Sequence, residues 1–270
     1  MSLPATTPVA LPRRFERPSP LAFLAYVAVA AALIAAIDSV DISVEGLVRG
    51  LPGLSNMLAQ MFPPDAARLP QILRALAETF AMALVGTALG LALSLPLAII
   101  ATRRLSPHPS LYHAARALIA LFRTVPDLIW ALLFVIAVGL GPFAGTLALA
   151  VDTIGFCGRF FAEAMEEADQ GPQEALAALG DSRLGIVASA VVPACMPSFI
   201  NTALFTLEKT TRASVVLGLV GAGGIGIELK VAMDLFNYDQ AATIIICIFL
   251  LVVAVERVSS LLRQRVIAGS

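Results

Sequence analysis

Long charge-free apolar stretches restrict the folds open to this chain. Residues 21–37 contain no charged side chain, and further charge-free apolar stretches recur as far as residue 255. A helix needs about twenty apolar residues to cross a bilayer. Only 14% of the 270 residues are charged, against about 25% in an ordinary soluble protein. The sequence therefore predicts an all-α integral membrane protein with about six transmembrane helices, over residues 21–37, 77–101, 126–140, 142–162, 197–220 and 241–262.

Basic residues predict the orientation of these spans, because Arg and Lys concentrate in cytoplasmic loops. If both termini are cytoplasmic, twelve arginines lie on the inner side and four basic residues lie on the outer side. A cleaved signal peptide is the alternative for the first span, but no clear A-x-A cleavage site follows it. The expected organisation is a cytoplasmic tail (1–20), the first span (21–37), an extracytoplasmic segment (38–76), a core domain (77–262) and a cytoplasmic tail (263–270).

A glycine-rich segment, VLGLVGAGGIGIE (Val216–Glu228), begins within the outer end of the fifth predicted span. It contains a G-x-G-x-x-G pattern at Gly221, Gly223 and Gly226. Such a pattern binds a dinucleotide when it joins a strand to a helix in a soluble domain. Here the preceding apolar run belongs to a membrane helix, and the pattern lies at its outer end, so we reject the nucleotide site. We expect instead that these glycines and Gly224 form a tight, irregular backbone segment at an outer gate.

The longest polar insertion on the predicted inner side, residues 163–193, contains a short helix. Pro172 suits the first turn of a helix, and Gly180 suits the left-handed conformation that ends one. A helix from Pro172 to Leu179 is about 12 Å long, too short to cross a membrane. Its surface is mostly alanine with one acid, Glu174. The residues alone leave two interpretations open, a surface helix between spans and a helix that inserts into a groove of a partner protein.

Four segments carry a resemblance to a known family. They read RTVPDLIWALLF (Arg123–Phe134), VGLGPFAGTLALA (Val138–Ala150), GPQEALAALG (Gly171–Gly180) and SVVLGLVGAGGIG (Ser214–Gly226). The third segment, with Pro193 beyond it, resembles the EAA loop of ABC importer permeases. Together the four resemble the phosphonate-type branch of these permeases, whose fold is a type I, MetI-like bundle. Leu176, Ala190 and Val192 depart from the family pattern, each with one apolar residue in place of another.

The resemblance implies a function and a set of partners. It implies the permease subunit of an ATP-driven importer in a bacterial cytoplasmic membrane, whose cargo is a phosphonate or a phosphate- or phosphite-like oxyanion. The implied partners are an external substrate-binding protein, a second permease (an identical copy or a paralogue) and two cytoplasmic ATPase subunits. The ATPase subunits are expected to dock on the EAA loop through Glu174, Ala175, Ala178 and Gly180. The net charge of −1 gives no indication of a nucleic-acid partner.

The chain itself is expected to be a non-catalytic subunit without a cofactor or a metal site. A phosphate-binding G-x-x-x-x-G-K-[ST] loop needs a Gly-Lys pair, whereas the two lysines follow Glu208 and Leu229. ATP and Mg are therefore expected on the ATPase partner. The alternatives are a permease for another ABC cargo, a secondary transporter, which should show matched broken helices in two halves, and a membrane enzyme. Against the enzyme, His108 and His113 lie in a basic loop away from other catalytic candidates and are interpreted as solvated.

Polar and ionisable residues in the fifth span are candidates for the translocation pathway, because charges inside a membrane usually face a cavity or one another. These candidates are Asn201, Glu208, Thr211, Arg212 and Ser214. Glu208 and Arg212 are four residues apart on one helix face. They form a structural ion pair, or Arg212 contacts a passing anion; both interpretations stay open. Lys209 lies about 100° round the helix and is expected to point elsewhere.

Other residues within the spans are expected to be structural. Gly86 and Gly90 form a G-x-x-x-G pattern that allows a second helix to approach closely. Arg123 and Asp127 are expected to pair at the start of the third span. The three cysteines, Cys157, Cys195 and Cys247, are too far apart to indicate a disulfide framework or a metal site, and are expected in the core.

Overall fold

A computed structural model of the protein describes residues 19–40 and 43–268. Every regular element in these residues is helical, as the sequence predicts. The chain divides into two compact units, Met1–Asn56 and Met57–Ser270. The expected N-terminal tail, with its three arginines, lies almost wholly outside the described residues.

The first unit contains α1 (Pro20–Ser39) and most of α2 (Val44–Gln60). The Ser19 hydroxyl accepts a hydrogen bond from the Ala22 N–H and caps α1. α1 is long and apolar enough to cross a membrane, in agreement with the first predicted span. The segment expected to be extracytoplasmic, residues 38–76, is largely helical, because it contains α2 and the first turns of α3.

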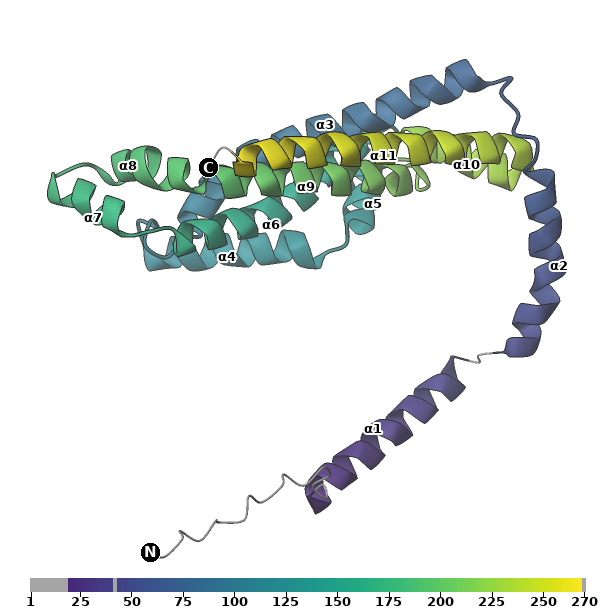
Figure 1. Ribbon diagram of the computed structural model, residues 1–270, viewed down its shortest axis with the longest axis horizontal. Coiled ribbons are helices and arrows are strands. Elements are labelled where there is room, and N and C mark those ends of the chain that lie inside the picture. Colours follow the sequence, from purple (N-terminus) through teal and green to yellow (C-terminus); the bar gives the residue numbers. More distant parts are fainter. Residues whose placement is uncertain (1–18, 41–42, 269–270) are drawn as a thin grey trace, which may run out of the picture. The chain divides into compact units, whose positions relative to one another are not determined.

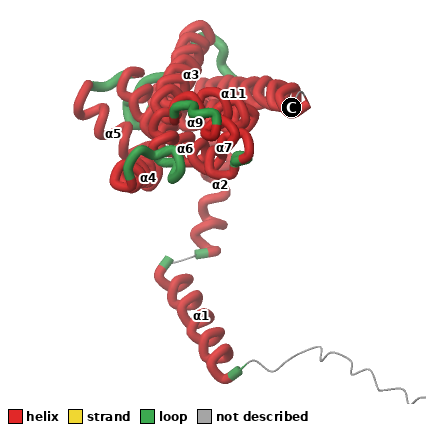
Figure 2. The backbone as a smooth tube through the Cα atoms, turned by 90° about the vertical axis from the view of Figure 1, so that its left-hand side faces the viewer, coloured by secondary structure: helices red, strands yellow, loops and turns green. Residues whose placement is uncertain are grey.

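The second unit is built on four long helices that run side by side (Figure 1). These are α3 (Leu69–Ile100), α6 (Pro142–Glu167), α9 (Val192–Gly218) and α11 (Tyr238–Ala268). The view along the bundle in Figure 2 places α9 among the other three. The G-x-x-x-G pattern of α3 faces α6, as predicted. A Cβ added to Gly86 would lie 2.8 Å from Leu149 Cβ, and one added to Gly90 would lie 2.8 Å from the Ala150 carbonyl oxygen.

The predicted core of the third span, residues 126–140, is helical over residues 127–138, but it is not part of one straight spanning helix. Two helices, α4 (Pro109–Thr124) and α5 (Asp127–Val138), meet instead at an angle of 91°. A residue before proline avoids the helical conformation, and Val125 is extended (ψ 121°) immediately before Pro126. α5 alone is about 18 Å long, too short to cross a bilayer. Five helices of the described residues qualify as spans, or six if α4 and α5 together form one bent span.

The fifth span begins well before residue 197. After α7 (Gly171–Ala178), one helix of 36 residues runs from Arg183 to Gly218 through α8 (Arg183–Ile186), a π-helical turn η1 (Val187–Val191) and α9. Pro193 lacks an N–H, and its ring crowds the carbonyl of Ser189. The wider turn of η1 contains Ser189 and accommodates this crowding. The segment between the long helices is therefore residues 168–182, shorter than the expected loop over residues 163–193.

The last span also differs from the prediction. A helix that the sequence did not predict, α10 (Ile225–Asp234), precedes it. α11 continues to Ala268, so residues 263–268 extend the helix where a tail was expected. α7 and α8 lie at one end of the bundle and α10 lies at the other (Figure 1). The expected coupling loop and the glycine-rich segment are therefore at opposite ends of this unit.

Candidate functional site

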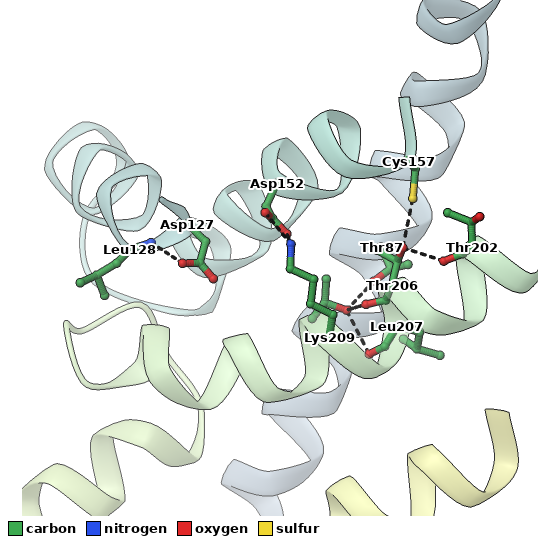
Figure 3. Close-up of polar contacts among 10 residues, drawn as sticks. Thr87, Asp127, Leu128, Asp152, Cys157, Thr202, Thr206, Leu207 and Lys209 are labelled. Atoms are coloured by element: carbon green, nitrogen blue, oxygen red, sulfur yellow. Dashed lines mark hydrogen bonds and ion pairs between the residues drawn. The ribbon is translucent and has the colours of Figure 1, made fainter. Parts of the chain in front are cut away.

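Hydroxyl groups connect three helices in the centre of the bundle (Figure 3). The hydroxyl oxygens of Thr87 on α3 and Thr210 on α9 lie 2.7 Å apart, and the Cys157 sulfur on α6 lies 3.1 Å from the Thr206 hydroxyl on α9. All four side chains are buried. These contacts satisfy polar groups that hydrocarbon surroundings would leave without partners. The other two cysteines are also buried and free, so the prediction that all three are core residues is confirmed.

Two ion pairs lie beside these hydroxyls, on consecutive residues of α9. The Lys209 ammonium donates to both carboxylate oxygens of Asp152 on α6, at 2.9 and 2.8 Å, and lies 4.8 Å from the centre of the Phe156 ring (Figure 3). The Glu208 carboxylate accepts a hydrogen bond of 2.7 Å from Arg263 on α11. Lys209 thus points toward α6, away from the Glu208 side chain.

The sequence left open an ion pair between Glu208 and Arg212, and these two side chains do not form one in the structure. Glu208 is buried and faces α11, whereas the Arg212 side chain is exposed on another face of α9. The spacing of four residues allows Glu208 to pair with Arg212 on the same helix. The Glu208 carboxylate is buried between α9 and α11, however, and it pairs with the Arg263 guanidinium of α11. Arg212 is therefore not held by Glu208.

The other candidates in α9 divide between two faces of the helix. Thr211 and Ser214 are buried, and their hydroxyls donate to carbonyls of their own helix at 2.7 and 2.9 Å. Asn201 and Arg212 belong instead to an outward face with positions three or four residues apart, as one helix face requires. We name this face the α9 stripe; it comprises Ser198, Asn201, Phe205, Lys209, Arg212 and Val216. A groove of about 310 Å³ beside it is lined by Phe156, Asn201 and Arg263, among others.

Arg123 and Asp127 do not form the expected pair. They lie on either side of the bend between α4 and α5, and no ion pair joins these two described side chains. The Asp127 carboxylate accepts instead from the Leu128 N–H, at 2.9 Å, in the first turn of α5 (Figure 3). His108 and His113 are exposed at the start of α4, where the His108 ring accepts from the Ser110 N–H at 3.2 Å.

The short helix expected in the polar insertion is α7, and its bounds agree with the prediction to within one residue. Gly180 follows it with φ 83°, the left-handed conformation expected there. Glu174, Ala175 and Ala178 are exposed. A cavity of about 260 Å³ lies beneath the helix, lined in part by Arg104, Glu174 and Arg183. α7 therefore presents small side chains at the end of the bundle.

The glycine-rich segment is irregular, as predicted. Gly221, Gly223 and Gly224 have φ values of 88°, 91° and 75°, which residues with a Cβ rarely adopt. Gly226 is needed for a different reason, because a Cβ there would lie 2.7 Å from the Gly218 Cα. The element before the segment is the helix α9, and not the strand of a dinucleotide-binding unit.

Two side chains of α3 hold the end of this segment. The Glu78 carboxylate accepts from the Gly224 N–H at 2.9 Å, and the Thr79 hydroxyl accepts from the Ile225 N–H at 2.7 Å. At its other end the Gly221 carbonyl accepts from the Gly141 N–H at 3.0 Å. The segment thus joins the end of α9 to the start of α10 and is held by α3 and by the start of α6.

Comparison with known proteins places the chain in a family. Residues 94–268 match the family described as the binding-protein-dependent transport system inner membrane component. The chain belongs to this permease family. It is a multi-pass membrane protein and a component of a transport system, and its expected relation to ABC importer permeases of the phosphonate branch is confirmed.

Three similar proteins illustrate the family. The chain is 43% identical to the phosphate-import permease protein PhnE of Mycolicibacterium smegmatis over 78% of its own length, but spans only 40% of that relative. It is 39% identical to the phosphite transport system permease protein PtxC of Stutzerimonas stutzeri, over 81% of this chain and 79% of that one. The permease chain of the inward-facing MetNI methionine ABC transporter aligns with a TM-score of 0.66 and 25% identity, over 75% of this chain and 99% of that one.

Three ionisable residues of this permease were missed from the sequence. Asp152 and Glu78 are acids within predicted spans, and the reasoning applied to the fifth span would have identified them. Arg263 gave no such signal, because it follows the predicted end of the last span and was assigned to a solvated tail. Its pairing with Glu208 depends on α11 continuing past that point.

Proposed function

We propose that this permease is the membrane-spanning subunit of an ATP-driven importer for phosphorus oxyanions, a class that includes phosphite, phosphate and phosphonates. The observation that carries the cargo class is the 39–43% identity to permeases named for phosphate and phosphite, against 25% to the methionine transporter. Lys209 and Arg212 on the α9 stripe support an anionic cargo, because cations within a membrane helix usually serve a substrate pathway or a partner charge.

ATP hydrolysis is supplied by separate ATPase subunits, which bind ATP and Mg²⁺, and α7 docks on them. The exposed position of α7 at one end of the bundle supports this role, as do its small side chains and the left-handed Gly180 that follows. Glu174 contacts the ATPase surface, and movement of α7 is passed to α6 and α9, to which it is joined by short connections. This chain contributes no catalytic group and no cofactor.

A second permease, identical or a paralogue, covers the α9 stripe. Exposure of Asn201, Lys209 and Arg212 to lipid would be costly, so this face lines a water-filled pathway between two permeases. The phosphate-import relative supports a paired arrangement, since the part that does not align with this chain is long enough for a second domain of similar size.

The protein lies in a bacterial cytoplasmic membrane with both termini in the cytoplasm. α7 is then on the inner side, and the glycine-rich segment forms the outer gate, where an external binding protein delivers the cargo. The arrangement of α7 and α10 at opposite ends of the bundle supports their placement on opposite sides of the membrane, and the excess of arginines on the proposed inner side supports the orientation.

Reconstitution of the whole importer tests the proposal. The permease, its ATPase and its binding protein are placed in proteoliposomes, and uptake of radiolabelled phosphite, phosphate and methylphosphonate is compared with uptake of methionine. We expect import of at least one phosphorus compound that requires both ATP and the binding protein, and no import of methionine. Import of methionine without any phosphorus oxyanion would show that the cargo class is wrong.

A further inference from the structure

The two ion pairs of α9 differ in how firmly they are enclosed. The Glu208 and Arg263 side chains are 7% and 24% exposed, whereas those of Asp152 and Lys209 are 14% and 34% exposed. Glu208 and Arg263 join α9 to α11 with the carboxylate enclosed, although Arg263 also lines the groove beside the α9 stripe. Lys209 instead belongs to the α9 stripe, so that one side of its ammonium group is open.

The Asp152–Lys209 pair lies near the middle of the membrane. Asp152 is ten residues from the start of α6 and Lys209 is nine residues from the end of α9. These intervals correspond to about 15 and about 14 Å along each helix. The hydrocarbon core of a bilayer is about 30 Å thick. An anion that crosses beside the α9 stripe therefore passes this pair half-way.

The chemistry of Lys209 allows its partner to be exchanged. An ammonium group is a compact charge on a flexible stem, whereas a guanidinium holds a carboxylate in a fixed two-pronged geometry. The Phe156 ring, 4.8 Å from the Lys209 nitrogen, contributes a cation–π contact that does not depend on Asp152. The ammonium can thus turn from Asp152 to another oxyanion without losing all of its stabilising contacts.

We propose that the Asp152–Lys209 pair is an exchangeable anion site in the pathway, which determines the passage of the phosphorus oxyanion. The inference rests on the proposed function. The cargo anion displaces the Asp152 carboxylate from the Lys209 ammonium group. The Asp152 carboxylate then rebinds Lys209 and thereby releases the cargo. Asp152 has two effects: it neutralises Lys209 when no cargo is present, and it keeps the cargo from binding too tightly to leave.

Charge-removing variants of this pair and of an ion pair away from the α9 stripe provide a matched test. K209M, D152N and the double variant K209M/D152N are compared with R116M, E166Q and R116M/E166Q in the reconstituted importer. Arg116 on α4 and Glu166 on α6 form this other ion pair, and their side chains are 29% and 35% exposed. Assembly with the ATPase and uptake of radiolabelled phosphite and phosphate are measured for each. We expect both double variants to assemble, because neither leaves a charge without its partner.

Uptake should separate the two pairs. In K209M/D152N it should fall about tenfold, the loss expected when a charged donor to an anion is removed, whereas R116M/E166Q should retain most of it. K209R, which keeps the charge, should retain more uptake than K209M. If K209M/D152N imports like the wild type, the pair is only structural and the inference is overturned.

Direct binding gives a second and independent measurement. Equilibrium binding of radiolabelled phosphite, with phosphate in a parallel series, is measured on the purified permease–ATPase complex without binding protein. D152N should bind the oxyanion more tightly than the wild type, because Lys209 is then free, and K209M/D152N should lose this gain. Equal binding by D152N and K209M/D152N would overturn the inference. A wild-type importer that carries no phosphorus oxyanion would contradict the proposed function instead, so the two failures are distinguishable.

Discussion

Arg212 shows how the surroundings of a single residue change its interpretation. It shares a helix face with Lys209, but Lys209 is held by Asp152, whereas Arg212 is exposed and is not bonded to Glu208. A cation in this position contributes little to packing within the subunit. Its effect is therefore expected on transport and not on assembly.

Replacement of Arg212 by Gln tests this expectation. Uptake of phosphite by the reconstituted importer should fall by about tenfold, because a charged hydrogen-bond donor is lost from the pathway, while assembly with the ATPase stays normal. Lys230→Gln is the matched control, since Lys230 is an exposed lysine on α10 that pairs within its own helix. Unchanged uptake in Arg212→Gln would remove Arg212 from the pathway.

The glycines at residues 223 and 224 are a second residue-scale feature with a measurable consequence. Alanine at either position must adopt a positive φ, and its Cβ would lie 2.6 Å from the Pro142 Cα or 2.5 Å from the Thr79 hydroxyl, respectively. A strained backbone of this kind costs about 1–3 kcal/mol. Gly223→Ala and Gly224→Ala should therefore lower uptake and the thermal midpoint of unfolding.

The control for these two variants is Gly53→Ala. Gly53 lies in α2 with a negative φ, and a Cβ there meets nothing within 4 Å. The same substitution should leave uptake and thermal stability unchanged. ATPase binding should persist in all three variants, because the glycine-rich segment is at the opposite end of the bundle from α7. Wild-type uptake in both Gly223→Ala and Gly224→Ala would contradict a required backbone geometry.

At the scale of elements, α7 combines a short length with direct connections to two long helices. Residues 168–170 join it to α6, and residues 179–182 join it to the helix that continues as α9. Because these connections are short, a displacement of α7 should also move α6 and the helix that continues as α9. The size of the side chains on α7 and the left-handed conformation of Gly180 are therefore the two properties on which docking of a partner should depend.

Ala175→Trp and Gly180→Val alter these two properties separately. The indole should block insertion of α7 into a groove of the ATPase, and valine should disfavour the left-handed turn. Both proteins should reach the membrane but show low uptake and ATP hydrolysis that is weak or independent of cargo. Ala59→Trp, at an exposed alanine of α2, is the size-matched control and should couple normally. Normal coupling in both α7 variants would exclude α7 as the transmission element.

At the scale of the whole molecule, the orientation in the membrane decides what each end of the bundle can contact. The three native cysteines are buried, so they should react little with a labelling reagent. Asp169, before α7, and Asn237, after α10, are both exposed. The proposed orientation places Asp169 in the cytoplasm and Asn237 outside.

Cysteine labelling in intact cells measures this orientation. With Cys157, Cys195 and Cys247 replaced by alanine, Asn237→Cys should react with a membrane-impermeant maleimide from outside. Asp169→Cys should react only after the membrane is permeabilised. The cysteine-free parent is the control for background. The reverse pattern would invert the topology and would place α7 outside, away from any cytoplasmic ATPase.

The sequence by itself determined the helical class, most of the spans, the position of α7 and the irregular glycine segment. Each of these depends on local physics. Apolar length fixes which segments enter a membrane, Pro172 and Gly180 mark the ends of one short helix, and closely spaced glycines tolerate positive φ values wherever they occur.

Only the tertiary structure decided which helix faces open outward and which charges meet. Glu208 can pair within α9 by spacing alone, yet it pairs with Arg263 because α11 lies against that face, and Lys209 finds Asp152 because α6 lies against the next one. Pro126 marks the position of the bend between α4 and α5, but its angle of 91° was not predictable from the proline alone, because both helices also pack against α6. The physical reason is that a buried charge takes the nearest opposite charge in space, and sequence spacing reports distance only along one helix.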